Sequence, residues 1–102
     1  MLIFVKGRYL DQIKAGTKTA TFRPWKTTTL QRDDQLHFNG RVRVTITRVV
    51  RSTLSTVTDD DIRAIGFASR SAFRRAIREL YPTLPPDAPC VVLHFSPPPR
   101  QS

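Results

Sequence analysis

The sequence is poor in several residue types, and each shortage excludes a class of protein. Its 102 residues include one cysteine, Cys90, so no intramolecular disulfide framework can form and a reducing cytoplasm is the expected compartment. With only two histidines, far apart at His37 and His94, the chain lacks the spacing of a four-ligand metal site. No apolar run approaches the roughly eighteen residues of a membrane span. We therefore expect a cytoplasmic domain without a membrane segment, metal or other cofactor.

Acidic residues are also scarce. Eight aspartates and glutamates face 17 lysines and arginines, which gives a net charge of +9 and a sequence pI near 11.1. Thirteen of the basic residues are arginine, whose planar guanidinium binds phosphate oxygens in pairs and stacks on nucleobases. This excess predicts a nucleic acid or nucleotide partner, the alternative being a basic surface that serves only solubility.

The order of apolar patterns predicts a single α+β domain over residues 1–96 and a disordered proline-rich tail over 97–102. Residues 2–5 are typical of a buried strand, and a short helix ending at Gly16 follows. Asn39-Gly40 predicts a tight turn that pairs residues 35–38 with 41–50. The last strand is expected within 90–95, with Cys90 as a core residue.

Two further helices are expected between these strands. Thr58 is a suitable N-cap, and Asp59, Asp60 and Asp61 after it favour a helix start over a metal site, because acids offset the positive end of the helix dipole. The next helix spans 71–81, with Phe73, Ile77 and Leu80 facing inward. Because strands dominate and no glycine-rich phosphate loop is present, the pattern favours a small curved β-barrel with two or three peripheral helices.

The stretch "GTKTATFRPW", residues 16–25, places three polar side chains close together. Lys18, Thr21 and Arg23 would suit a pocket for an anionic or amide-bearing ligand, or a solvated edge strand. Side chains alternate along a regular strand, so Lys18 joins Thr21 only if the chain bends before Thr19. If it does, the positive charges of Arg23 and Lys6 would lower the pKa of Lys18 and allow it to act as a base on Thr21. Without the bend, Lys18 extends from the barrel rim to solvent.

Other residues complete a candidate binding surface. Trp25 shares a strand face with Thr21 and Arg23, where it is able either to stack on a base or to plug the barrel, and Tyr9 lies on the helix that leads into the motif. Five arginines are candidates for phosphate contacts along one strand face and one helix flank, with a solvated face as the alternative: Arg41, Arg43, Arg70, Arg74 and Arg78.

Several segments in order resemble the ASCH domain family. The motif "KTATFR" after a glycine-terminated helix is similar to the family signature, and "DQLHF" and "RVRVTITRVVRSTL" resemble its second and third barrel strands. "AFRRAIRELYP" is similar to its Tyr-Pro helix and "CVVLHF" to its final strand. The resemblance covers about residues 2–95, and it implies a PUA-like β-barrel that binds RNA or nucleotides in a cleft beside the motif.

One bacterial branch of this family hydrolyses the acetyl amide of N(4)-acetylcytidine. The resemblance maps its catalytic lysine and threonine onto Lys18 and Thr21 and its arginine onto Arg23. The branch's assisting glutamate does not carry over, because its place falls at Gly66. The alternative is a shifted alignment in which one of the nearest acids, Asp59, Asp60 or Asp61, serves in its place. We therefore expect RNA or nucleoside binding, with amide hydrolysis as the first alternative. Cleavage of single-stranded RNA and a non-enzymatic role as an adaptor for an acidic protein are further alternatives.

Overall fold

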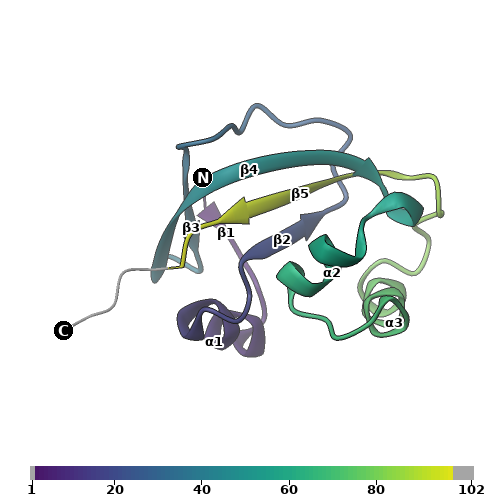
Figure 1. The fold of residues 1–102 in the computed structure, drawn as a ribbon, viewed down its shortest axis with the longest axis horizontal. Coiled ribbons are helices and arrows are strands. Elements are labelled where there is room, and N and C mark those ends of the chain that lie inside the picture. Colours follow the sequence, from purple (N-terminus) through teal and green to yellow (C-terminus); the bar gives the residue numbers. More distant parts are fainter. Residues whose placement is uncertain (1, 98–102) are drawn as a thin grey trace.

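The computed structural model describes residues 2–97 and contains one five-stranded sheet with three α-helices. Figure 1 shows these elements along the chain. In order they are β1 (Leu2–Ile3), α1 (Gly7–Ala15), β2 (Ala20–Arg23), β3 (Gln35–Phe38), β4 (Val42–Thr53), a 3-10 turn (Leu54–Thr56), α2 (Asp59–Ile65), α3 (Arg70–Leu80) and β5 (Pro89–Phe95). The predicted tail over 97–102 lies, apart from Pro97, outside the described residues.

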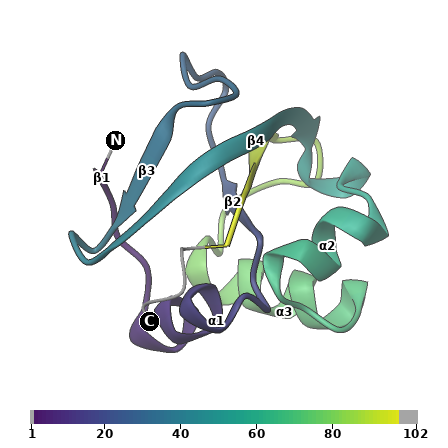
Figure 2. The same ribbon diagram turned by 60° about the vertical axis from the view of Figure 1, so that its left-hand side comes forward.

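The strands follow the order β1-β3-β4-β5-β2, and the sheet is not closed. Its middle is the long strand β4, which pairs antiparallel with β3 through its first residues and with β5 through its last. A shift of register between Ile46 and Arg48 separates these two halves, and Figure 2 shows the resulting bend of β4. The predicted α+β class is confirmed. The predicted barrel is corrected to a curved, open sheet, because β1 and β2 are its two edges and do not pair with each other.

Strand β5 is buried on both faces and divides the core into two clusters. Val91, Leu93 and Phe95 pack with α1, β3 and the first half of β4. Cys90 and Val92 point to the other face, where α2, α3 and β2 cover them. Cys90 is therefore a core residue, as expected. The helices follow this division, with α1 beside the start of β2 and with α2 and α3 together (Figures 1 and 2).

Local sequence signals predict several of the boundaries. Asn39 and Gly40 adopt positive φ angles of 54° and 69° and connect β3 to β4, so the hairpin is confirmed. Gly16 ends α1 in the left-handed conformation with φ 80°. The hydroxyl of Thr58 accepts a hydrogen bond from the Asp61 backbone N–H, which confirms the N-cap of α2.

Two expectations about buried residues need correction. The first strand is shorter than predicted, because it pairs only with β3 at the sheet edge, and Phe4 beyond it is 70% exposed. Leu80 was expected to face inward with Phe73 and Ile77, but it is 41% exposed at the end of α3. Strand β2 is limited to Ala20–Arg23, because the residues before it form the bend described below.

Within residues 2–97, no helix is both long enough and apolar enough to cross a bilayer.

Candidate functional site

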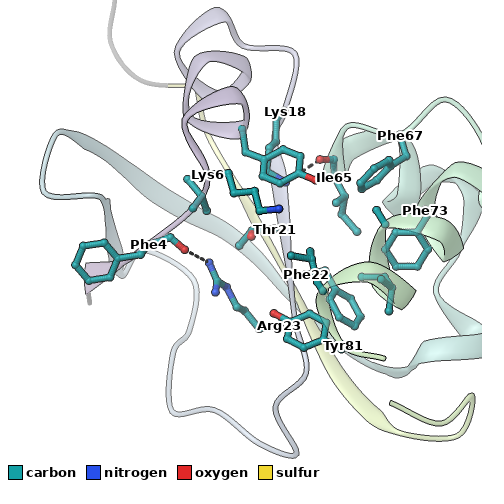
Figure 3. A pocket seen from close by; sticks show the side chains of 15 residues that line it. Phe4, Lys6, Lys18, Thr21, Phe22, Arg23, Ile65, Phe67, Phe73 and Tyr81 are labelled. Atoms are coloured by element: carbon teal, nitrogen blue, oxygen red, sulfur yellow. Dashed lines mark hydrogen bonds between the residues drawn. The ribbon is translucent and has the colours of Figure 1, made fainter. Parts of the chain in front are cut away.

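A cavity of about 360 Å³ opens between the start of α1, strand β2, the end of α2 and the helix α3. Figure 3 shows this cavity and its lining side chains. Its volume lies within the range of small-molecule sites. The lining includes three cations, six aromatic rings and Thr21: Phe4, Lys6, Tyr9, Lys18, Thr21, Phe22, Arg23, Phe67, Phe73 and Tyr81 are among its residues.

A bend before β2 brings Lys18 into this cavity. The left-handed Gly16 reverses the chain, and the backbone N–H of Lys18 donates to the Gln12 carbonyl of α1 at 3.2 Å. The N–H of Thr19 donates to the Ala64 carbonyl of α2 at 2.8 Å, so the segment is tied to both helices. Regular strand geometry begins only at Ala20. Because Lys18 lies outside the alternating strand, it lines the same cavity as Thr21.

Lys18 is a buried amine with two backbone partners. The residue is 4% exposed, and its Nζ donates to the carbonyls of Ala20 at 2.8 Å and Ile65 at 2.7 Å. Burial, together with the smaller effect of the positive charge of Arg23, lowers the pKa of Lys18 from its ordinary 10.5 to about 7. A neutral amine keeps two N–H groups for these carbonyls, and its lone pair then occupies the fourth tetrahedral position.

Arg23 lies lower on the same wall, on β2. One of its terminal nitrogens donates to the Phe4 carbonyl at 3.3 Å, as the dashed line in Figure 3 marks. Its Nε is buried and has no hydrogen-bond partner among the described residues. Burial lowers the pKa of the guanidinium below its usual range, while Tyr81 acts in the opposite direction. A buried N–H without an acceptor is unfavourable, so this donor suits a ligand oxygen.

Thr21 lies between these two cations. It is 3% exposed, and Figure 3 places it on the cavity wall between Lys18 and Arg23, with the Lys6 side chain extending toward it. No hydrogen bond joins Lys18 to Thr21 in the part of the chain that the structure describes. Tyr9 contributes its ring, whose centroid is 5.6 Å from the Lys18 amine. Five of the predicted site residues therefore line one cavity: Lys6, Tyr9, Lys18, Thr21 and Arg23.

Trp25 and two of the predicted arginines lie elsewhere. Trp25 does not line the cavity and packs against the core cluster around α1 and β3 instead, which matches the plug alternative. Arg41 is exposed just before β4, and Arg43 is exposed on the face of β4 opposite the buried Val42 and Val44.

The arginines of α3 do not form one free stripe. Arg70 donates to the Asp59 carboxylate at 2.8 Å and to the Val57 carbonyl at 2.7 Å, so it fastens α3 to α2. Arg74 and Arg78 line a separate cavity of about 370 Å³ on the flank of α3.

Gly66 occupies the place that the sequence resemblance assigns to an acid. It ends α2 with a φ of 113°, and a β-carbon built there would lie 3.0 Å from Oε1 of Gln12 and 3.8 Å from Cβ of Lys18. The position is therefore close to Lys18, but it has no side chain. No acid is among the described residues that line the cavity, and within residues 2–97 no cluster of three or more potential metal ligands occurs.

The nearest candidate acid has a different partner. Asp61 is 4% exposed, and its Oδ1 lies 2.8 Å from Nε2 of His94 on β5 and 3.4 Å from the guanidinium of Arg48 on β4. This contact fastens the first turn of α2 to the sheet. His94 is thus a partly buried histidine with a side-chain partner.

Sequence reasoning missed several aromatic lining residues, chiefly Phe67 and Tyr81. Phe67 follows α2, and Tyr81 follows α3. The periodicity of apolar residues shows which side chains face inward, but it does not distinguish those that line a cavity from those that pack in the core. Tyr81 belongs to the Tyr-Pro pair that supports the family resemblance, and this pair was the one available signal for it.

Comparisons with known proteins agree on the fold. The crystal structure of a hypothetical protein matches with a TM-score of 0.78 and 18% identity over 94% of this chain and 96% of that one. The ASCH domain from Lactobacillus crispatus matches with a TM-score of 0.78 and 17% identity, over 93% of this chain and 77% of that one. The ASCH protein from Zymomonas mobilis matches with 0.68 and 12% identity, over 93% and 65%.

No family model and no curated protein matches the sequence. The resemblance to ASCH domains that the sequence suggests is confirmed in the fold, since this chain has the fold of solved ASCH domains.

Proposed function

We propose that the protein binds RNA through a nucleoside held in the cavity between Lys18, Thr21 and Arg23. The observation that carries this proposal is Arg23, which lines the cavity together with Lys6 and Lys18 and has a buried Nε donor without an acceptor. A ligand with carbonyl or phosphate oxygens would satisfy that donor, and nucleobases and their phosphates carry both.

The aromatic lining supports the same class of ligand. Tyr9, Phe67 and Tyr81 offer ring faces beside the cations, and base–aromatic stacking contributes roughly 1–3 kcal/mol per base. The net charge of +9 favours a polyanionic nucleic acid over a neutral small molecule.

Calorimetric titration with N(4)-acetylcytidine, cytidine, uridine, adenosine and guanosine tests nucleoside binding directly. Arg23→Gln removes the unpartnered donor and is expected to lower the affinity for the nucleoside at least tenfold. Arg75→Gln removes the same charge from an exposed position of α3 that lines neither cavity, and it serves as the matched control. Affinity for all five nucleosides below detection, or equal affinity in the Arg23→Gln and wild-type proteins, would contradict the proposal.

Amide hydrolysis of N(4)-acetylcytidine is a second candidate, favoured by the lowered pKa of Lys18 in the same cavity as Thr21. In this reaction neutral Lys18 takes the proton of the Thr21 hydroxyl, directly or through a water, while Oγ1 attacks the acetyl carbonyl. The C–N bond breaks, and the Lys18 ammonium returns the proton to the departing amino group of cytidine. Water then hydrolyses the acetyl-threonine ester to acetate. Lys18 thereby supplies the proton transfer for which the family uses a further acid.

Release of cytidine and acetate from N(4)-acetylcytidine tests this second candidate. Thr21→Val keeps the shape of the side chain and removes the nucleophile, so turnover is expected to fall to the uncatalysed level. Turnover that survives this change excludes Thr21 as the nucleophile. If the wild-type protein binds the nucleoside without turnover, its role is binding alone. The ribonuclease alternative has no separate support, because neither a histidine nor a carboxylate is among the described lining residues.

A further inference from the structure

Two cavities lie on opposite flanks of helix α3 and meet at its C-terminal end. Ile77 and Tyr81 line both of them. Ile77 is buried and forms a shared floor, whereas Tyr81 is half-buried and stands between the two openings. The Tyr81 ring packs on Phe22 of β2 with 6.4 Å between ring centroids, so it is a supported ridge rather than a free side chain.

The sequence of α3 gives its two flanks different chemistry. Ala76 and Leu80 face the first cavity and are apolar. Arg74 and Arg78, one turn apart, face the second cavity. The opposite wall of the second cavity comes from the segment after β4 and the loop before β5, chiefly Leu54, Leu84 and Pro86.

Arg74 and Arg78 are free to bind an anion. Unlike that of Arg70, neither side chain makes a hydrogen bond or an ion pair with any residue between 2 and 97. No acidic residue is among the described residues lining their cavity. Two unpaired guanidinium groups at this spacing repel each other, and a phosphate between them relieves that repulsion.

We infer that one strand of single-stranded RNA occupies both cavities and crosses the Tyr81 ridge between them. The nucleoside of the proposed function lies in the first cavity, and the phosphate of a neighbouring nucleotide binds Arg74 and Arg78 in the second. The apolar wall of Leu54 and Leu84 contacts the neighbouring sugar or base. The inference rests on the proposed function and adds a second contact site on the same RNA strand, at Arg74 and Arg78.

The test compares a nucleoside with a short RNA in the same variants. N(4)-acetylcytidine and a five-nucleotide single-stranded RNA with N(4)-acetylcytidine at its centre are titrated at several salt concentrations. The RNA is expected to bind wild-type protein at least tenfold more tightly than the nucleoside. Arg74→Gln/Arg78→Gln is expected to abolish this difference and to leave the nucleoside affinity unchanged. The control Arg32→Gln/Arg75→Gln removes the same charge at exposed positions outside both cavities and should retain the difference.

Salt dependence gives an independent measure. Each phosphate contact on a single strand contributes about 0.7 to the slope of log affinity against log salt concentration. Loss of Arg74 and Arg78 is expected to reduce that slope by roughly 0.7 to 1.4, for one or two phosphates, and the control pair should leave it near the wild-type value.

The outcomes separate this inference from the proposed function. The inference is overturned if the RNA binds no more tightly than the nucleoside, or if its tighter binding persists in Arg74→Gln/Arg78→Gln. In either case nucleoside binding in the first cavity is still supported. If neither probe binds, both fail. Competition by poly-glutamate as effective as that by RNA would assign the two arginines to an acidic protein and overturn the inference.

Discussion

The side-chain amide of Asn39 pairs with the backbone of Val5 in both directions. The Val5 N–H donates to Oδ1 at 2.8 Å, and Nδ2 donates to the Val5 carbonyl at 2.9 Å. The amide thus ties the chain after β1 to the end of β3, beyond the last paired residues Ile3 and Phe38. It fixes the segment of Phe4, Val5 and Lys6, which forms one wall of the candidate site.

Substitutions of Asn39 are expected to loosen this wall. Asn39→Gly tolerates the φ of 54° but loses both hydrogen bonds, which predicts a loss of about 1–2 kcal/mol in the free energy of unfolding. Asn39→Asp keeps an acceptor for the N–H but turns a carboxylate oxygen toward the Val5 carbonyl, so a larger loss is expected. Urea denaturation measures both. Equal stability of the aspartate and wild-type proteins would contradict the role of the amide.

The lowered pKa of Lys18 predicts that stability rises with pH. The unfolded chain, with the ordinary pKa of 10.5, binds a proton more readily between pH 7 and 10.5 than the folded protein, whose Lys18 has a pKa of about 7. The folded state is therefore penalised below pH 7 and the penalty is relieved above it, by up to about 1.4 kcal/mol per pH unit.

Lys18→Met provides the control for this pH dependence. Denaturation of both proteins at pH 7 and pH 9 isolates the Lys18 contribution, because the other titrating groups are common to both. The wild-type protein should gain stability relative to Lys18→Met as the pH rises. Parallel curves would indicate that Lys18 titrates near its ordinary value.

Gly66 is expected to resist substitution. Its φ of 113° is unfavourable for any residue with a β-carbon, and that atom would lie 3.0 Å from Oε1 of Gln12. Gly66→Ala should cost at least about 1–2 kcal/mol of stability. Gly7→Ala is the matched control, because Gly7 has open space around its β position and begins α1. Thermal unfolding of the two variants compares them, and similar midpoints would refute the argument.

The contact of Asp61 with His94 is expected to hold α2 on the sheet. Asp61→Asn removes the buried charge from its bond with His94 and Arg48, and a loss of about 1–3 kcal/mol is expected. Asp60→Asn lies in the same helical turn, faces solvent and pairs with exposed Arg63, so its effect should be much smaller. Equal losses in the two variants would assign the effect to the helix dipole instead.

Features set by neighbouring residues are predictable from the sequence. The turn at Asn39-Gly40 and the caps at Thr58 and Gly16 follow from local geometry and are confirmed. The sequence predicts that Lys18 joins Thr21 only if the chain bends before Thr19. It does not predict the bend itself, because the bend depends on hydrogen bonds to the more distant Gln12 and Ala64.

Contacts between distant segments could not be predicted in this way. The pairing of Asn39 with Val5 joins residues 34 positions apart, and that of Asp61 with His94 joins residues 33 apart. Asn39 is already explained locally as a turn residue, and Asp61 as an acid in the first turn of a helix. Nothing in the local sequence therefore indicates that either side chain has a distant partner. Likewise, an open sheet and a closed barrel need the same alternating strands, so pattern alone does not distinguish them.

The central position of β5 constrains when the domain is able to fold during translation. Strand β2 pairs with no other strand than β5 among residues 2–97, and β5 also completes the partner set of β4. A ribosome releases β2 and β4 long before residues 89–95 emerge from its exit tunnel. Until that moment both strands expose unpaired backbone, so the nascent domain depends on late translation, and on any chaperone that shields those edges, to reach its final form.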